Sequence, residues 1–238
     1  MAEAVPQFEQ LSQDQRKAFA LQLLDEQIVE ARKRLHFWRN LTNQPAQVDS
    51  GYISQHLVSF ITHLKGGGFR GKGLDLSDGS EVKSANFLDS EDARGAVAPR
   101  WNFLIKQASE MCAYLKCKWI YLVSIDKYKE GVRVRVWRLS PKQHEDFATR
   151  FKLWAKKVGY PIFQPRDGKR RDANFQLFPP RNGSEDGYAR HGGGGPAGPQ
   201  KVRLPELKIM LNKPPGSVLL FHAEQQSDSK FKLIRWAV

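Results

Sequence analysis

Residues 71–85, GKGLDLSDGSEVKSA, combine carboxylates and a lysine with a turn signal. Asp75, Glu81 and Lys83 could do chemistry here, because paired carboxylates bind a divalent cation and an ammonium group neutralises developing negative charge. An Asp-Gly pair between two short extended runs is typical of a β-hairpin. The length of the hairpin loop therefore decides whether the three charged groups meet.

Two loop lengths are compatible with this stretch. A two-residue loop, Asp78-Gly79, points Asp75 and Glu81 to opposite faces of the hairpin. A three-residue loop, Ser77-Asp78-Gly79, is a type I turn followed by glycine in the left-handed conformation, and it pairs Asp75 with Glu81. Lys83 lies two residues beyond Glu81 and shares its face.

The apolar residues favour the longer loop. In that register Leu74, Leu76 and Val82 share one face, which can pack on a core, while the charged side chains share the other. Two carboxylates held this close repel each other unless a cation joins them. Mg²⁺ takes one or two protein carboxylates, keeps several waters, and can activate a water for attack on a phosphate. The stretch thus predicts metal-assisted phosphodiester hydrolysis, with Mg²⁺ as the cofactor.

Composition indicates the substrate. The 238 residues include 38 Lys and Arg against 25 Asp and Glu, and this net charge of +13 is typical of a protein that binds nucleic acid. The two cysteines, Cys112 and Cys117, have no metal-ligand spacing and indicate a reducing compartment. We see no N-terminal signal pattern and no apolar run long enough to span a membrane, so we expect a protein of the prokaryotic cytoplasm.

The longest helical pattern covers residues 12–41. Its apolar residues, from Leu21 to Trp38, repeat at spacings of three and four along one face. That face can pack on the helix's own domain or pair with a second copy of the chain, and the pattern is too short to decide between the two. A second helix, over 52–64, directly precedes the charged stretch.

The rest of the chain reads as mixed α/β. We expect, in order, a helix over 102–115, a buried strand over 118–126, a strand over 131–139 with its arginines outward, a helix over 141–158, one short strand within 160–199, a short helix within 202–211, and a hairpin of 217–224 with 231–238. The single domain then divides into the N-terminal helix at 12–41, a catalytic core at 50–140 and a basic, loop-rich part at 160–238, a candidate for DNA recognition.

The motif D-x5-E-x-K, from Asp75 to Lys83, resembles that of the PD-(D/E)xK nuclease superfamily. With GYISQHL before it and PRWN after it, the stretch is similar to type II restriction endonucleases over about residues 50–126. The resemblance implies an α/β restriction-endonuclease-like core, with a central mixed sheet flanked by helices in the order αβββαβ. It also implies Mg²⁺-dependent, sequence-specific cleavage of double-stranded DNA. Cutting both strands of a palindrome calls for two sites related by a two-fold axis, so we expect a homodimer.

The resemblance also implies roles for single residues. Asp75 and Glu81 would be metal ligands, the backbone carbonyl of Val82 a third, and Lys83 the catalytic lysine. Asp78 stays open as an alternative to Asp75, although the register favours Asp75. On the helix before the stretch, Gln55 stands where the superfamily often has a polar or acidic residue near the metal.

The predicted DNA contacts are mostly basic or amide side chains. They are Arg70, Lys72, Ser84, Arg100, Asn102, Arg166, Lys169, Arg170 and Arg171. Arginine and asparagine can read guanine and adenine by paired hydrogen bonds, and a basic run can bind phosphates.

Two other functions are compatible with these residues. A repair or recombination nuclease of the same superfamily would share Asp75, Glu81 and Lys83 but recognise DNA shape. A non-catalytic DNA-binding protein would use the hairpin only as structure. Nucleotide binding is not supported, because GGGFRGKG lacks the Lys-Ser/Thr ending of a P-loop.

Overall fold

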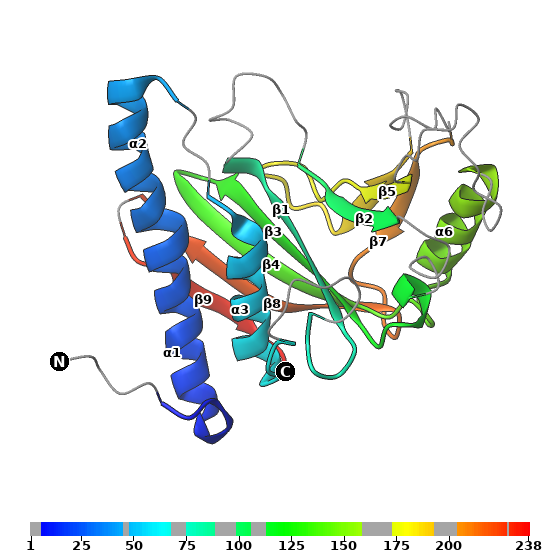
Figure 1. Ribbon diagram of the computed structural model, residues 1–238, viewed down its shortest axis with the longest axis horizontal. Coiled ribbons are helices and arrows are strands. Elements are labelled where there is room, and N and C mark those ends of the chain that lie inside the picture. Colours follow the sequence, from blue (N-terminus) through cyan, green and yellow to red (C-terminus); the bar gives the residue numbers. More distant parts are fainter. Residues whose placement is uncertain are drawn as a thin grey trace.

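A five-stranded mixed sheet forms the centre of the molecule (Figure 1). The computed structural model describes residues 6–44, 48–67, 75–88, 99–105, 113–158, 173–192, 204–227 and 229–238. The strand order is β1-β3-β4-β8-β9, and β1 runs parallel to β3 while the other neighbours are antiparallel. The strands are β1 (Glu81–Asn86), β3 (Ile120–Tyr128), β4 (Gly131–Leu139), β8 (Ser217–Gln225) and β9 (Lys232–Trp236). The predicted strands over 118–126 and 131–139 and the C-terminal hairpin are thereby confirmed.

Helices cover one face of this sheet. They are η1 (Phe8–Gln10), α1 (Gln13–Leu24), the π-helical η2 (Asp25–Glu30), α2 (Ala31–Thr42) and α3 (Ser50–Thr62). The segments from α1 to α2 form one continuous helical run, as predicted, and Ser12 caps it through the expected reciprocal contact with Gln15. Leu24 and Ile28 are buried with α3 against the sheet, whereas the far end of α2 projects beyond it (Figure 1).

A second layer covers the other face. It contains α6 (Glu145–Val158) and two antiparallel strand pairs, β2 (Trp101–Ile105) with β5 (Ala173–Leu177) and β6 (Tyr188–His191) with β7 (Leu207–Met210). Phe103, Phe147, Phe151 and Phe175 pack together here at the centre of an aromatic core. Within the described residues, no helix is both long and apolar enough to cross a membrane.

The predicted helix over 102–115 is wrong in its first part. Residues 101–105 form β2, and only 113–116 of the described remainder are helical. Trp101, Phe103 and Ile105 are buried while Asn102 is exposed, a period of two that fits a strand. The strand that pairs with it, β5, places Phe175 opposite Phe103 from more than 70 positions away, so the local pattern could not reveal this partner.

Three further predictions need correction in the second half of the chain. The helix expected from residue 141 begins at Glu145, after a turn. The described part of 160–199, residues 173–192, contains two strands, β5 and β6, instead of one. The short helix expected within 202–211 is instead strand β7, which β6 stabilises by antiparallel pairing.

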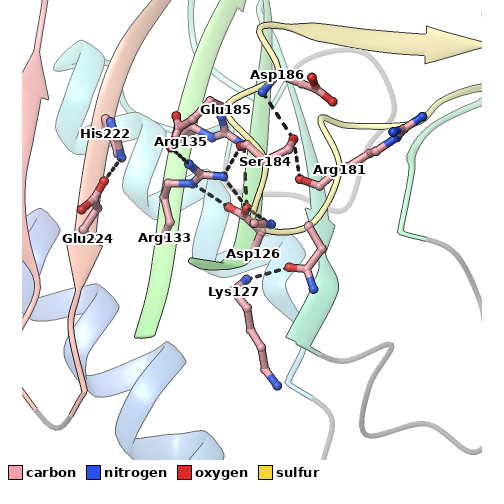
Figure 2. Close-up of polar contacts among 12 residues, drawn as sticks. Asp126, Lys127, Arg133, Arg135, Arg181, Ser184, Glu185, Asp186, His222 and Glu224 are labelled. Carbon is pink, nitrogen blue, oxygen red and sulfur yellow. Dashed lines mark hydrogen bonds and ion pairs between the residues drawn. The ribbon is translucent and has the colours of Figure 1, made fainter. Parts of the chain in front are cut away.

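The arginines of β4 were predicted to face solvent, but Arg133 and Arg135 are buried. Arg133 makes a two-pronged ion pair with Asp126 on the neighbouring strand, at 2.7 and 3.2 Å (Figure 2). Its guanidinium also donates to the carbonyl of Ser184 at 2.6 Å, and the Gly183 amide donates to Asp126 at 3.1 Å. This Asp126–Arg133 pair therefore fixes the loop that follows β5 onto the sheet. Burial lowers the pKa of Arg135 to about 10.

Candidate active site

Strand β1 presents Glu81 and Lys83 on the same face, toward the aromatic core. Their side chains form an ion pair, and the Glu81 side chain is almost fully buried. Burial is the largest single effect on the pKa of Lys83 and lowers it, but the nearby Glu81, Tyr114 and Asp75 together outweigh burial and raise the pKa above its ordinary value. Lys83 is therefore held as a cation beside a carboxylate at the start of an edge strand.

The turn before β1 brings Asp75 to the same place. The Gly79 amide donates to the Leu76 carbonyl at 3.1 Å, the Leu76 amide donates to the Ser80 carbonyl at 3.2 Å, and Gly79 has a φ of 84°. This is the predicted three-residue loop with its left-handed glycine. Val82 and Leu76 lie in the core under α3, on the face opposite the charged groups, as expected.

The two arms of this turn do not continue as a hairpin within the described residues. Leu76 bridges Gly66 instead, and β1 pairs with β3. The Asp75 carboxylate rather than its backbone contacts β1, because its Oδ2 accepts from the Val82 amide at 2.8 Å. Burial raises the pKa of Asp75, against the opposing effects of the Val82 amide and the Lys83 ammonium.

Asp78 points elsewhere. Its Oδ1 accepts from the Ser80 amide at 3.1 Å, and its Oδ2 lies 3.4 Å from the Lys118 ammonium. The carboxylate thus stabilises the turn itself. Of the two aspartates that the sequence left open, Asp75 is the one whose carboxylate contacts β1.

Gln55 contributes from α3. Its amide nitrogen donates to Oδ1 of Asp75 at 3.0 Å, so both oxygens of this carboxylate are held by hydrogen bonds. Gln55 therefore contacts Asp75, one of the predicted metal ligands, while its predicted place near a metal stays a prediction.

Sequence reasoning missed two adjacent aromatic rings that contact Lys83. Its ammonium lies 5.1 Å from the ring centroid of Tyr114 and 5.8 Å from that of Phe103. Both rings favour the charged form and fix its position. Burial raises the pKa of the nearby Cys117 thiol to about 12, which disfavours the reactive thiolate form.

The donor atoms at this site suit a hard divalent cation. They are the carboxylates of Asp75 and Glu81 and the carbonyl of Val82. The Val82 amide faces Asp75, and the N–H and C=O of an extended residue point to the same side of a strand, so the Val82 carbonyl lies on that side too. Mg²⁺ binds oxygen donors and needs only one or two carboxylates. In the described part of the chain, no three His, Cys, Asp or Glu side chains gather as a metal-binding cluster.

The other predicted DNA contacts divide into three groups. Ser84 faces α3, where its hydroxyl accepts from Ser54 at 2.9 Å and donates to Ser50 at 3.1 Å, so it does not join Lys83. Arg100 and Asn102 lie on or next to β2. The remaining ones lie outside the described residues: Arg70, Lys72, Arg166, Lys169, Arg170 and Arg171.

A sequence model of the MamI restriction endonuclease family matches residues 37–223, more than half of the chain. The chain belongs to the MamI restriction endonuclease family. The matched region includes Gln55, Asp75, Glu81 and Lys83.

Among curated proteins, the Type II restriction enzyme MamI of Microbacterium ammoniaphilum is 34% identical over 172 residues. The alignment covers 64% of this chain and 50% of the relative, so the chain spans about half the length of that MamI enzyme. No solved structure matches the chain.

Proposed function

We propose that this chain is a Mg²⁺-dependent, sequence-specific endonuclease that cuts double-stranded DNA. The observation that carries the proposal is the meeting of Asp75, Glu81 and Lys83 at the start of β1, in a member of a restriction endonuclease family. The net charge of +13 complements a polyanionic substrate.

Each residue of the site has a distinct proposed role. Asp75, Glu81 and the Val82 carbonyl would hold the metal ion, which when bound lowers the pKa of a coordinated water and offsets negative charge on the phosphate. Lys83 would orient that water and stabilise the charge that develops during attack. Gln55 would keep the Asp75 carboxylate in its orientation, as outer-shell partners of metal ligands do.

Digestion of a defined supercoiled plasmid tests this function. With Mg²⁺ we expect discrete fragments with reproducible ends, and with excess EDTA we expect none. A preference for branched over linear duplexes would instead indicate a repair or recombination nuclease. Retardation of the plasmid without any cleavage would indicate a non-catalytic DNA-binding protein.

We also propose that the enzyme acts as a homodimer, because a palindromic site needs two catalytic centres related by a two-fold axis. The end of α2 supports this role for the N-terminal helix, since Phe37, Trp38 and Leu41 are 64, 56 and 70% exposed. Such a concentration of apolar side chains is typical of an interaction surface. The proposed location is the prokaryotic cytoplasm, where the single described cysteine, Cys117, stays a free thiol.

Light scattering measures the oligomeric state directly. We expect the wild-type mass to be twice that of the chain, and the Trp38→Lys variant to shift toward the monomer, because a buried unpaired charge at an interface costs several kcal/mol. Leu153→Lys is the matched control, since Leu153 is an exposed apolar residue on α6. Equal dimer fractions for wild type and Trp38→Lys would show that this end of α2 is not part of the dimer interface.

A further inference from the structure

The β2–β5 ribbon has two chemically different faces. Trp101, Phe103 and Phe175 are fully buried on its inner face. The outer face carries Arg100, directly before β2, together with Asn102, Leu104, Asn174 and Gln176. Its described residues therefore include one guanidinium and three amides but no carboxylate. This outer face leaves amide and guanidinium groups available to a polar ligand.

Side chains across the ribbon hold one another in defined orientations. The Asn174 amide nitrogen donates to Oδ1 of Asn102 at 2.9 Å, and an Arg100 Nη1 donates to Oε1 of Gln176 at 3.3 Å. The Asn102 oxygen keeps a second lone pair and its NH₂ group keeps two donors, while Arg100 keeps its other N–H groups. Asn102, the exposed member, is thus oriented by its neighbour with donor and acceptor sites remaining for a ligand.

The edges of DNA bases match these groups. In the major groove adenine offers an acceptor and a donor that an asparagine or glutamine amide binds in pairs, and guanine offers two acceptors that arginine binds in pairs. The major groove also admits a two-stranded β-ribbon. The absence of carboxylates on the described outer face suits the negative potential of the groove.

The ribbon is attached to the candidate active site by its inner face. The Phe103 ring contacts the Lys83 ammonium, and the Trp101 indole donates to the Val123 carbonyl of β3 at 2.7 Å. The Asp126–Arg133 pair fixes the loop that follows β5 onto the same sheet (Figure 2). The proposed reading face and the candidate active site are thus connected by direct contacts through the inner face of the ribbon.

We propose that the outer face of the β2–β5 ribbon is the base-reading surface of this enzyme. Asn102 and Arg100 contact base edges in the major groove, and Asn174 and Gln176 position them. The inference rests on the proposed endonuclease function and names the part of the chain that gives it sequence specificity.

A cleavage assay with a set of duplexes tests the ribbon. Fragment ends from wild type define the cognate site, and the set then holds this site and each of its single-base variants. For Asn102→Ala we expect cleavage of the cognate duplex to fall roughly tenfold to hundredfold, the cost of losing one paired base contact. For duplexes that differ from the cognate site at one particular base pair, the ratio of the cognate cleavage rate to the variant cleavage rate should fall toward one. Arg100→Ala should do the same at a different base pair.

Gln13→Ala, at an exposed amide at the start of α1, is the control and should leave all ratios unchanged. Asn174→Ala removes the hydrogen bond that orients Asn102 but keeps the Asn102 side chain. It should lower the same cleavage ratio as Asn102→Ala, by a smaller factor. Unchanged ratios, or an equal fall on every duplex, would overturn the ribbon inference while leaving the nuclease proposal intact. If wild type cleaves no duplex, the proposed function itself fails.

Discussion

Replacing Lys83 by alanine should lower the rate of DNA cleavage by about hundredfold to thousandfold, the usual effect of removing one preorganised group that stabilises transition-state charge. The structure gives the reason. Lys83 pairs with Glu81 and its ammonium lies against the rings of Tyr114 and Phe103, so these contacts set its position before charge develops on the phosphate. Affinity for DNA should change little, because one buried cation adds little to a surface with a net charge of +13.

Single-turnover cleavage of a plasmid under saturating protein and Mg²⁺ measures this rate. The matched control is Lys118→Ala, because Lys118 also lies beside the turn but pairs with Asp78 and is mostly exposed. Lys83→Met is a second variant, which keeps the apolar stem against Phe103 and Tyr114 and separates loss of charge from loss of packing. Equal cleavage rates for wild type and both Lys83 variants would show that Lys83 has no role in the chemical step.

The turn at the candidate site could be predicted because the residues that determine it are close together in the sequence. The register of Ser77-Asp78-Gly79 follows from turn chemistry and from the alternation of Leu76 and Val82 with charged residues, and the structure has that loop. What the register did not predict is that Asp75 contacts β1 through its carboxylate instead of through a continued ladder. The backbone of Leu76 pairs with Gly66 instead of extending a hairpin ladder, and this bridge depends on the path of the chain after α3.

The features that were missed depend on contacts between distant segments. Arg133 and Arg135 look like the solvent face of β4, and only the buried Asp126 and the loop after β5 explain their burial. Likewise, β2 resembles the start of a helix until β5 pairs with it. Tyr114 is an ordinary helix residue in sequence, and its contact with Lys83 arises only from the tertiary fold.

Asp75→Asn and Asp78→Asn should differ widely although the two aspartates are three positions apart. Asp75→Asn removes a negative charge from the carboxylate that contacts β1, so with the proposed role of Asp75 as a ligand it should weaken metal binding. Loss of an outer-shell partner already costs about tenfold to hundredfold in metal affinity or activity, and loss of a direct ligand should reach at least the upper end. Asp78→Asn keeps an acceptor for the Ser80 amide and loses only a pair with the exposed Lys118, worth about 0.2–1 kcal/mol of stability.

Initial cleavage rates over a range of Mg²⁺ concentrations separate the two variants. For Asp78→Asn we expect the wild-type rate and the wild-type Mg²⁺ dependence. For Asp75→Asn we expect a half-maximal rate at a much higher Mg²⁺ concentration and a lower maximum. Gln55→Ala should shift the Mg²⁺ dependence in the same direction by a smaller factor, because it frees only one oxygen of Asp75. The reverse order, with Asp78→Asn inactive and Asp75→Asn normal, would mean that the turn rearranges when metal binds and that Asp78 is the first ligand.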